Sequence, residues 1–278
     1  MKYLFLFLLT MMAYAQEAPF FSETIYDTDD RLNISQLQNP SLGAAVVVAI
    51  SHRYARLNPL ITPPTLEARY LLCSDVAFAQ EPSIGDCTGV HVGSGLVLTA
   101  QHCVKNNYDC EKLSWAFDYT LESLSGSTLG FKHLYQCEAI VAQDEALDVA
   151  LIKLKQTPRL PKQKIDLRLG GADEVFAIGS PLGLSLKHSG VGAAVAESST
   201  HLRAAIDVFQ GNSGSPIFNL NEQMIGLLVS GGRDFESDPS GCRRNFVTRA
   251  EDPQERVVLL RGLPENMKKI IQRAQRSR

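Results

Sequence analysis

The segment Gly211-Asn212-Ser213-Gly214-Ser215-Pro216 holds a serine between two glycines, which let the chain turn tightly and keep the approach to the hydroxyl open. A serine hydroxyl is a weak nucleophile near neutral pH, because it needs a base to take its proton and an acid to orient that base. His102 in Thr99-Ala100-Gln101-His102-Cys103 can supply the imidazole, and Asp148 before Val149-Ala150-Leu151 can supply the carboxylate. Gly-Asn-Ser-Gly alone is also an ordinary turn. Three motifs in the order His, Asp, Ser predict nucleophilic catalysis.

The setting of each residue favours this interpretation over a structural one. His102 is one of six histidines, and an imidazole titrates near working pH, which suits a general base that later acts as a general acid. Asp148 lies in an apolar segment, where an unpaired carboxylate is costly and a paired one is favoured. The rival nucleophile-elbow motif requires G-x-S-x-G, but residue 215 is Ser and the order of the three groups differs.

Over about residues 40 to 250 the chain resembles the chymotrypsin-like (trypsin-like) serine peptidases, particularly the bacterial secreted branch. In that branch Asn precedes the nucleophile and Ser-Pro follows it. The resemblance implies an all-β fold of two six-stranded antiparallel β-barrels of chymotrypsin type with a C-terminal helix, and a catalytic cleft between the barrels. It also implies an oxyanion hole formed by the backbone N–H groups of Gly211 and Ser213.

The sequence defines the substrate pocket less well than it defines the candidate catalytic residues. Asp207 in Asp207-Val208-Phe209-Gln210-Gly211 resembles the pocket carboxylate of trypsin, which pairs with Arg or Lys of the substrate. A surface carboxylate that caps a strand is the alternative. Val229-Ser230-Gly231-Gly232 resembles the segment that pairs with the substrate backbone, although a plain hairpin turn would look the same. We therefore expect Asp207, Gln210, Ser230 and Gly232 to contact the substrate.

Two features depart from known branches of this family. Glutamyl endopeptidases carry a His near Leu228 or Val229, which are aliphatic here, although Asp29-Asp30-Arg31 resembles their mature N-terminus. Asn212 replaces the acid that, in trypsin, receives a freed N-terminal amine during activation. That ion pair cannot form in this chain.

Bulk properties limit the classes of partner and compartment. The 278 residues carry a net charge of −3, which gives no electrostatic case for a nucleic-acid partner. Residues 1–15 read as a signal peptide, with Lys2, an apolar run too short to span a membrane, and Ala13-Tyr14-Ala15 as the cleavage site. We expect a secreted protein, extracellular or periplasmic, without a membrane anchor. We expect it to be a monomer acting on proteins or peptides without a metal or cofactor.

Six cysteines suit an oxidising compartment, and they allow 15 pairings. The resemblance implies a disulfide between Cys87 and Cys103, beside His102. The sequence leaves Cys73, Cys110, Cys137 and Cys242 open, with a 110–137 bond as a guess. Zinc is disfavoured, because the chain has no C-x-x-C pair and no H-E-x-x-H helix.

Short apolar runs separated by Gly, Pro, Ser and Asn predict strands and favour a barrel or sandwich. The expected strands are 44–50, 90–98, 138–142, 149–154, 175–178, 204–209, 217–219 and 224–229. We expect residues 16–40 to form a pro-segment or an N-terminal strand, 41–155 the first barrel, 156–163 a linker, 164–250 the second barrel and 251–278 the C-terminal helix region.

The helical spacing of Met267, Ile270, Ile271 and Ala274 predicts a helix that packs on the second barrel. A basic helix on a membrane surface is the alternative.

Together these features predict a secreted serine endopeptidase that cleaves after Arg or Lys through an acyl-enzyme. A glutamyl-endopeptidase-like or broad-specificity peptidase is the first alternative, with Arg233, Arg243 and Arg244 as basic anchors. A catalytically silent homologue that acts as a binding module is the second, although no triad residue is lost. An HtrA-like protease is disfavoured, because little sequence follows residue 250 to form a PDZ domain.

Overall fold

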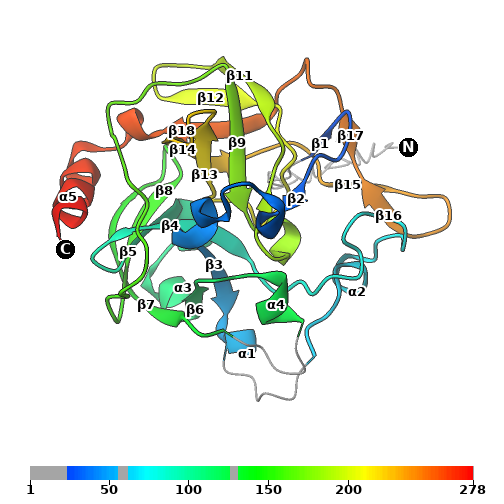
Figure 1. The fold of residues 1–278 in the computed structure, drawn as a ribbon, viewed down its shortest axis with the longest axis horizontal. Coiled ribbons are helices and arrows are strands. Elements are labelled where there is room, and N and C mark those ends of the chain that lie inside the picture. Colours follow the sequence, from blue (N-terminus) through cyan, green and yellow to red (C-terminus); the bar gives the residue numbers. More distant parts are fainter. Residues whose placement is uncertain (1–23, 56–61, 126–130, 278) are drawn as a thin grey trace, which may run out of the picture.

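The structure, a computed structural model, describes residues 24–55, 62–125 and 131–277, and the expected signal peptide lies outside them. Short strands dominate these residues, and the helices are brief apart from the last (Figure 1). The strands are β1 (Ile25–Tyr26), β2 (Leu32–Asn33), β3 (Val46–Ser51), β4 (Cys87–Gly93), β5 (Leu96–Ala100), β6 (Leu113–Ala116), β7 (Leu134–Asp144), β8 (Val149–Leu154), β9 (Glu174–Gly179), β10 (Lys187–His188), β11 (Gly192–Ala196), β12 (His201–Ala204), β13 (Pro216–Asn219), β14 (Met224–Ser230), β15 (Phe235–Ser237), β16 (Arg243–Asn245), β17 (Val247–Thr248) and β18 (Glu255–Leu259). The α-helices are α1 (His52–Ala55), α2 (Leu66–Tyr70), α3 (Asn107–Glu111), α4 (Leu121–Leu124) and α5 (Glu265–Arg276), and the 3₁₀ helices are η1 (Ile34–Gln36), η2 (Pro40–Ala45), η3 (Gln101–Cys103), η4 (Pro181–Gly183) and η5 (Leu260–Gly262).

The first barrel is a closed antiparallel ring in the order β3-β4-β5-β8-β7-β6. Its strand β3 reads Val-Val-Val-Ala-Ile because both of its faces are buried. Val46, Val48 and Ile50 join an apolar cluster that continues into the second barrel, while Val47 and Ala49 join a separate cluster around Trp115. The expected strand over 90–98 is instead a hairpin of β4 and β5, because Gly93 and Gly95 adopt positive φ at its turn.

The second barrel closes in the order β9-β11-β12-β18-β14-β13, because β11 also pairs with β9. The two six-stranded antiparallel barrels confirm the predicted fold class. The barrel extends past the expected boundary at residue 250, because β18 supplies one of its six strands. The strand expected over 204–209 is wrong: β12 ends at Ala204, and residues 205–209 are buried without joining a ladder.

The N-terminal segment packs on the second barrel through two short strands. β1 pairs in parallel with β17, and β2 pairs antiparallel with β10 at the edge of β9. Residues 24–33 therefore pack on the second barrel, with β1 and β2 as their two short strands.

Helix α5 was predicted correctly by its apolar spacing but packs in a different place. Met267, Ile271 and Ala274 are buried in the cluster that contains Val90 and Val92 of β4. The α5 helix contacts β4 and β7, and Gln275 Nε2 donates to the Val92 carbonyl at 2.8 Å. The expectation that α5 covers the second barrel is therefore wrong, because its apolar face completes the core of the first barrel.

Three disulfides join the six cysteines in the pairs Cys87–Cys103, Cys110–Cys137 and Cys73–Cys242. The first two agree with the implied and the guessed pairing. The third joins residues 169 positions apart, on the loop after α2 and on the β15–β16 hairpin. Within the described residues, no helix has the length and apolar character needed to cross a membrane.

Candidate active site

The register of β5 and β8 brings His102 next to Asp148. These strands are antiparallel with Ala100 opposite Val149, which puts the residue after β5 against the residue before β8. The ladder continues for one more bond, from the Gln101 N–H to the Asp148 carbonyl at 3.0 Å. Asp148 has a φ of 54°, a left-handed conformation that Asp tolerates better than most residues. The turn at Asp148 directs its carboxylate toward the short η3 helix that carries His102.

The Asp148 carboxylate binds His102 at two points. Its Oδ2 lies 2.6 Å from the imidazole Nδ1, and its Oδ1 accepts the His102 backbone N–H at 2.8 Å. A carboxylate on Nδ1 fixes the tautomer that leaves Nε2 free of a proton, and it stabilises the imidazolium when that proton arrives. Both side chains are about one-fifth exposed, which keeps the pair within reach of a substrate.

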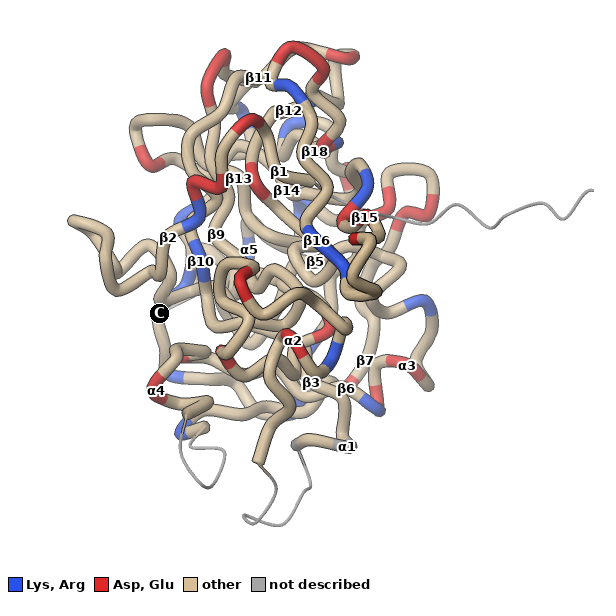
Figure 2. Tube along the Cα trace, turned by 90° about the vertical axis from the view of Figure 1, so that its right-hand side faces the viewer, with Lys and Arg blue, Asp and Glu red and all other residues tan. Residues whose placement is uncertain are grey.

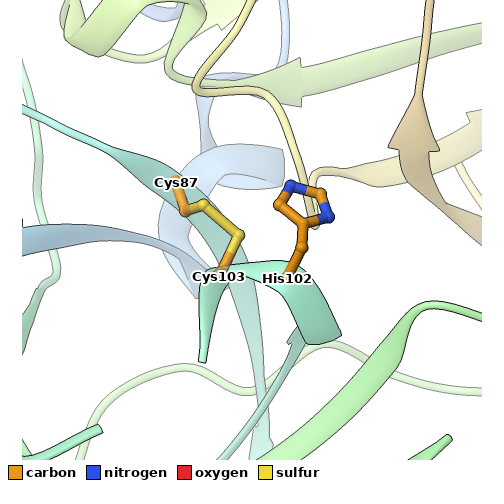
Figure 3. A group of neighbouring side chains, drawn as sticks. All are labelled: Cys87, His102 and Cys103. Atoms are coloured by element: carbon orange, nitrogen blue, oxygen red, sulfur yellow. A yellow bond between two sulfur atoms is a disulfide. The ribbon is translucent and has the colours of Figure 1, made fainter. Parts of the chain in front are cut away.

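A disulfide holds the position of His102 relative to β4. Cys103 follows His102 and is bonded to Cys87, the first residue of β4, as Figure 3 shows. Because Cys103 is adjacent in sequence, the bond restricts how far the η3 helix can move from the barrel wall. The Cys103 Sγ also lies 3.8 Å from the Ser213 carbonyl oxygen, which places the serine loop beside the histidine helix.

Ser213 lies on a turn that β4 anchors. Thr88, the residue after Cys87, donates its N–H to the Ser213 carbonyl at 2.9 Å and its hydroxyl to the Gly211 carbonyl at 2.7 Å. The oxygen of the Thr88 hydroxyl also accepts a hydrogen bond from the Ser180 N–H at 3.1 Å. His102 and Ser213 are therefore tied to one strand by adjacent residues. No sequence signal singles out Thr88, because a threonine in a strand is ordinary.

The glycines around Ser213 are required by the backbone. Gly211 and Gly214 have φ values of 102° and 84°, and a β-carbon on Gly214 would collide with the Thr88 carbonyl and the Thr99 hydroxyl. Among the described residues, no protein group accepts a hydrogen bond from the N–H of Gly211 or of Ser213. Two unused donors beside a serine are suited to bind an oxyanion.

Asp207 lies in surroundings that differ from those expected of a free pocket carboxylate. It is 4% exposed, and its two oxygens accept the N–H groups of Tyr26 and Asp30 at 2.8 and 2.7 Å. Burial raises the pKa of Asp207 to about 7, and the two N–H donors offset part of that effect. The expected contact with substrate therefore competes with bonds that hold the N-terminal segment in place.

The other expected pocket residues lie on two facing segments that a hydrogen bond joins. The exposed Gln210 donates its N–H to the buried Asp234 carboxylate at 3.2 Å, which links residues 207–211 to the segment after β14. Ser230 ends β14, and the Gly232 N–H donates to Glu255 Oε1 at 3.4 Å.

Two acids that were not expected from the sequence, Asp234 and Glu255, border this region. Glu255 is fully buried on β18. Its Oε1 accepts from the Tyr26 hydroxyl at 3.2 Å, and its Oε2 has no hydrogen-bond partner among the described residues. Burial is the main cause that raises the pKa of Glu255 well above its usual range, and Asp234 adds to the effect. The sequence contains a signal for this buried acid, because Glu255 is the first residue of the largely apolar strand Glu255–Leu259. An acid without a charged or hydrogen-bonding partner is unexpected in such a strand.

Two groups of side chains have the composition of metal sites. They are Cys87 with His102 and Cys103, and Cys73 with Asp238 and Cys242. In both groups the cysteines are bonded to each other, so that neither offers a thiolate. These groups therefore do not support a metal centre.

Comparison with known proteins places this geometry in a family. A family model described as a trypsin-like peptidase domain matches residues 87–227, which include His102, Asp148 and Ser213. The chain belongs to the trypsin-like peptidase family. Vibrio cholerae VesB protease has a similar fold, with a TM-score of 0.53 and 15% identity over 89% of this chain and 68% of that chain.

Curated relatives of this trypsin-like chain include HtrA-type proteins. Serine protease HTRA1 of Xenopus tropicalis is 32% identical over 178 residues, which are 58% of this chain and 35% of the relative. Magnetosome formation protease MamE of Paramagnetospirillum magneticum is 31% identical over 153 residues, 49% of this chain and 20% of the relative. This chain thus matches about a fifth to a third of each relative. The HtrA-like branch that the sequence analysis disfavoured is among the proteins it resembles.

Proposed function

We propose that this protein is a serine endopeptidase in which Ser213 is the nucleophile, His102 the general base and Asp148 the orienting carboxylate. The observation that carries the proposal is the pair of hydrogen bonds between Asp148 and His102, one to Nδ1 and one to the backbone N–H. The loop of Ser213 lies beside this pair. Membership of the trypsin-like peptidase family supports the same reaction.

In this mechanism the Ser213 hydroxyl oxygen attacks the substrate carbonyl carbon while His102 Nε2 takes its proton. The carbonyl oxygen gains negative charge and is stabilised by the N–H groups of Gly211 and Ser213. The protonated His102 then gives its proton to the leaving amine, and an acyl-enzyme remains on Ser213. Water, deprotonated by His102, attacks the acyl carbon and releases the acid, which restores the serine hydroxyl.

We propose a preference for Arg or Lys on the acyl side of the cleaved bond. Three buried carboxyl groups border the segments expected to hold the substrate, namely those of Asp207, Asp234 and Glu255. Burial disfavours the ionised form of the Glu255 carboxyl group. A guanidinium or ammonium group that enters this region would favour that ionised form. Asp207 already accepts hydrogen bonds from two backbone N–H groups. Asp234 and Glu255 therefore supply part of the cation binding.

We also propose that the protein acts outside the cytoplasm, in the periplasm or the medium. The leader-like residues 1–15 and the three disulfides support export, since disulfides persist in oxidising compartments. One relative, from Buchnera aphidicola, is described as a probable periplasmic serine endoprotease.

The test is hydrolysis of peptide esters that differ only in the residue before the cleaved bond. The wild type should cleave the Arg and Lys esters, and Ser213→Ala should lower kcat by about 10⁶-fold. A fluorophosphonate probe should label the wild type on Ser213 and leave the variant unlabelled. Ser240→Ala, in the exposed β15–β16 hairpin, is the matched control and should retain activity.

Each alternative has its own outcome. Equal cleavage of Glu and Arg esters would refute the cation-binding pocket while keeping the triad. A folded wild type that binds peptides but neither cleaves them nor reacts with the probe would be a silent homologue.

A further inference from the structure

The basic residues of this chain are concentrated in two segments that are far apart in the sequence. Residues 153–168 and 261–278 together hold twelve Lys and Arg but only two acids, Asp166 and Glu265. The rest of the chain holds 15 basic and 28 acidic residues, because the totals are 27 and 30. A chain with a net charge of −3 therefore carries a strongly positive part and a strongly negative part.

The structure joins the two segments into one surface. Lys162 Nζ donates to the carbonyls of Ala274, Gln275 and Ser277 at 3.3, 3.0 and 2.7 Å, where a cation also complements the C-terminal end of the α5 dipole. Gln275 Nε2 donates to the Gln163 carbonyl at 2.9 Å. We call the surface formed by residues 153–168 and α5 the basic face, and Figure 1 shows it on the side where α5 lies.

Most charges on the basic face have no acidic partner. Asp166 is bonded to Arg168 and Glu265 to Lys268, which uses both acids of the two segments. The exposed side chains of Lys164, Lys269, Arg273 and Arg276 form no ion pair with any described residue. On the opposite side of the molecule, which faces the viewer in Figure 2, acidic and basic positions are interspersed.

A groove crosses the basic face between residues 165–168 and α5. It has a volume of about 280 Å³ and is lined by Ile165–Arg168 and by residues of α5 from Ile271 to Arg276. Its lining combines the apolar side chains of Ile165, Leu167 and Ile271 with the guanidinium groups of Arg168 and Arg276 and the Asp166 carboxylate, to which Arg168 donates from Nε and Nη2 at 3.0 and 2.9 Å. Such a groove suits a ligand that joins a phosphate to a hydrocarbon chain, because Arg276, which forms no ion pair with a described residue, can bind phosphate through paired N–H groups while Arg168 adds its Nη1 group.

We propose that the basic face binds the surface of a membrane rich in anionic phospholipid, with a headgroup phosphate at Arg168 and Arg276. A nucleic acid fits less well, because neither segment contains a Phe, Tyr or Trp on which bases could stack. Helix α5 does not insert, since its apolar face is buried against β4, and binding is electrostatic and reversible. His102, Asp148 and Ser213 lie in neither segment and do not line the groove.

The test is co-sedimentation of the full mature chain with vesicles of phosphatidylcholine, alone or with about one-third phosphatidylglycerol. The protein should bind only the anionic vesicles and should be released at about 0.5 M salt, where charges are strongly screened. A triple variant, Lys164→Glu with Arg273→Glu and Arg276→Glu, should bind at least about a hundredfold more weakly, because each basic residue contributes about fivefold. Its hydrolysis of a soluble peptide ester should equal that of the wild type.

The matched control reverses three exposed basic residues outside the face, through Lys112→Glu, Lys132→Glu and Arg249→Glu. Its net charge equals that of the test variant, and its vesicle binding should fall by less than about threefold. Equal loss in both variants, absence of binding, or tighter binding to duplex DNA than to anionic vesicles would overturn the proposal. Should the triple variant fail to fold, Arg168→Gln with Arg276→Gln tests the groove by itself, and unchanged vesicle binding would count against it.

Discussion

Asp148 bonds two different nitrogens of the same residue, the ring Nδ1 and the backbone N of His102, at 2.6 and 2.8 Å. One carboxylate therefore fixes both the orientation of the imidazole and the position of the short helix that carries it. The bond to the backbone restrains the 3₁₀ turn in addition to the side chain.

Asp148→Asn should lower kcat by about 10³- to 10⁴-fold with a small effect on KM, because an amide donates to Nδ1 and favours the wrong tautomer. Steady-state hydrolysis of a peptide ester measures both constants. Glu145→Gln is the matched control, since this exposed carboxylate lies three residues away, and it should keep kcat within about twofold. A comparable loss of kcat in both variants would mean that Asp148 has no special role.

The sequence nominates His102, Asp148 and Ser213 through residue types and spacing that can be read along the chain. The glycines around Ser213 and the apolar residues after Asp148 are such local signals. The pocket could not be predicted in the same way, because its contacts join separate segments, 24 residues apart for Gln210 and Asp234 and more than a hundred apart for Asp207 and its partners. Asp207 illustrates the limit: its partners Tyr26 and Asp30 lie 181 and 177 residues away, in a segment without periodicity.

The position of α5 shows the same limit at the level of the fold. The spacing of Met267, Ile271 and Ala274 specifies which face of the helix is buried but carries no information about the surface that covers it. The resemblance pointed to the second barrel, and the structure places α5 against β4 of the first. The apolar face is buried in the core beside β4, and polar contacts from Gln275 to Val92 and from Lys162 to the helix end help to hold it there.

The disulfide beside His102 should matter for catalysis as well as for stability. Cys87→Ser with Cys103→Ser opens a link between residues 16 positions apart, which should lower the free energy of unfolding by about 3 kcal/mol. The double variant should also lower kcat, because the η3 helix is released from β4. Removing Cys110–Cys137, a link over 27 positions, is the matched control: stability should fall by a similar amount while kcat is retained below the melting temperature. Equal kcat in the two double variants would show that the first disulfide does not position His102.

Asp207 should make stability depend on pH near neutrality. Its pKa in the folded protein is about 7, above the ordinary value of 3.8, and the folded state therefore holds the proton over that interval. Stability should fall as pH rises from about 4 to about 7, by roughly 2 to 3 kcal/mol between pH 5 and pH 8.

Asp207→Asn is the test of this dependence, measured by urea unfolding at both pH values. The variant should be less stable than the wild type at pH 5, because the Tyr26 and Asp30 N–H groups bind different oxygens of Asp207 and the amide nitrogen of Asn, itself a donor, would face one of them. The deficit should shrink at pH 8, where the wild type has lost its proton. A deficit that is constant or grows with pH would contradict the raised pKa.

The Thr88 hydroxyl should hold the catalytic loop against the first barrel, in addition to the bond from the Thr88 backbone N–H to the Ser213 carbonyl. Thr88→Val keeps the shape of the side chain but leaves the Gly211 carbonyl and the Ser180 N–H without their partner. Each buried group that loses its bond costs about 1 to 3 kcal/mol, and the oxyanion donor on Gly211 loses its support. Urea unfolding should show the loss of stability, and peptide hydrolysis should show a fall in kcat that exceeds any change in KM.

Thr99→Val is the matched control for Thr88, because the Thr99 hydroxyl is also buried and donates to the Thr88 carbonyl at 2.6 Å. It should lower stability by about half as much, since it leaves one buried acceptor without its donor, whereas Thr88→Val leaves two buried groups without a partner. Its bond does not reach residue 211, and kcat for the folded fraction should therefore stay close to that of the wild type. If the two variants lower kcat equally at equal stability, the Thr88 hydroxyl contributes only to folding, and the oxyanion donors are positioned by the turn itself.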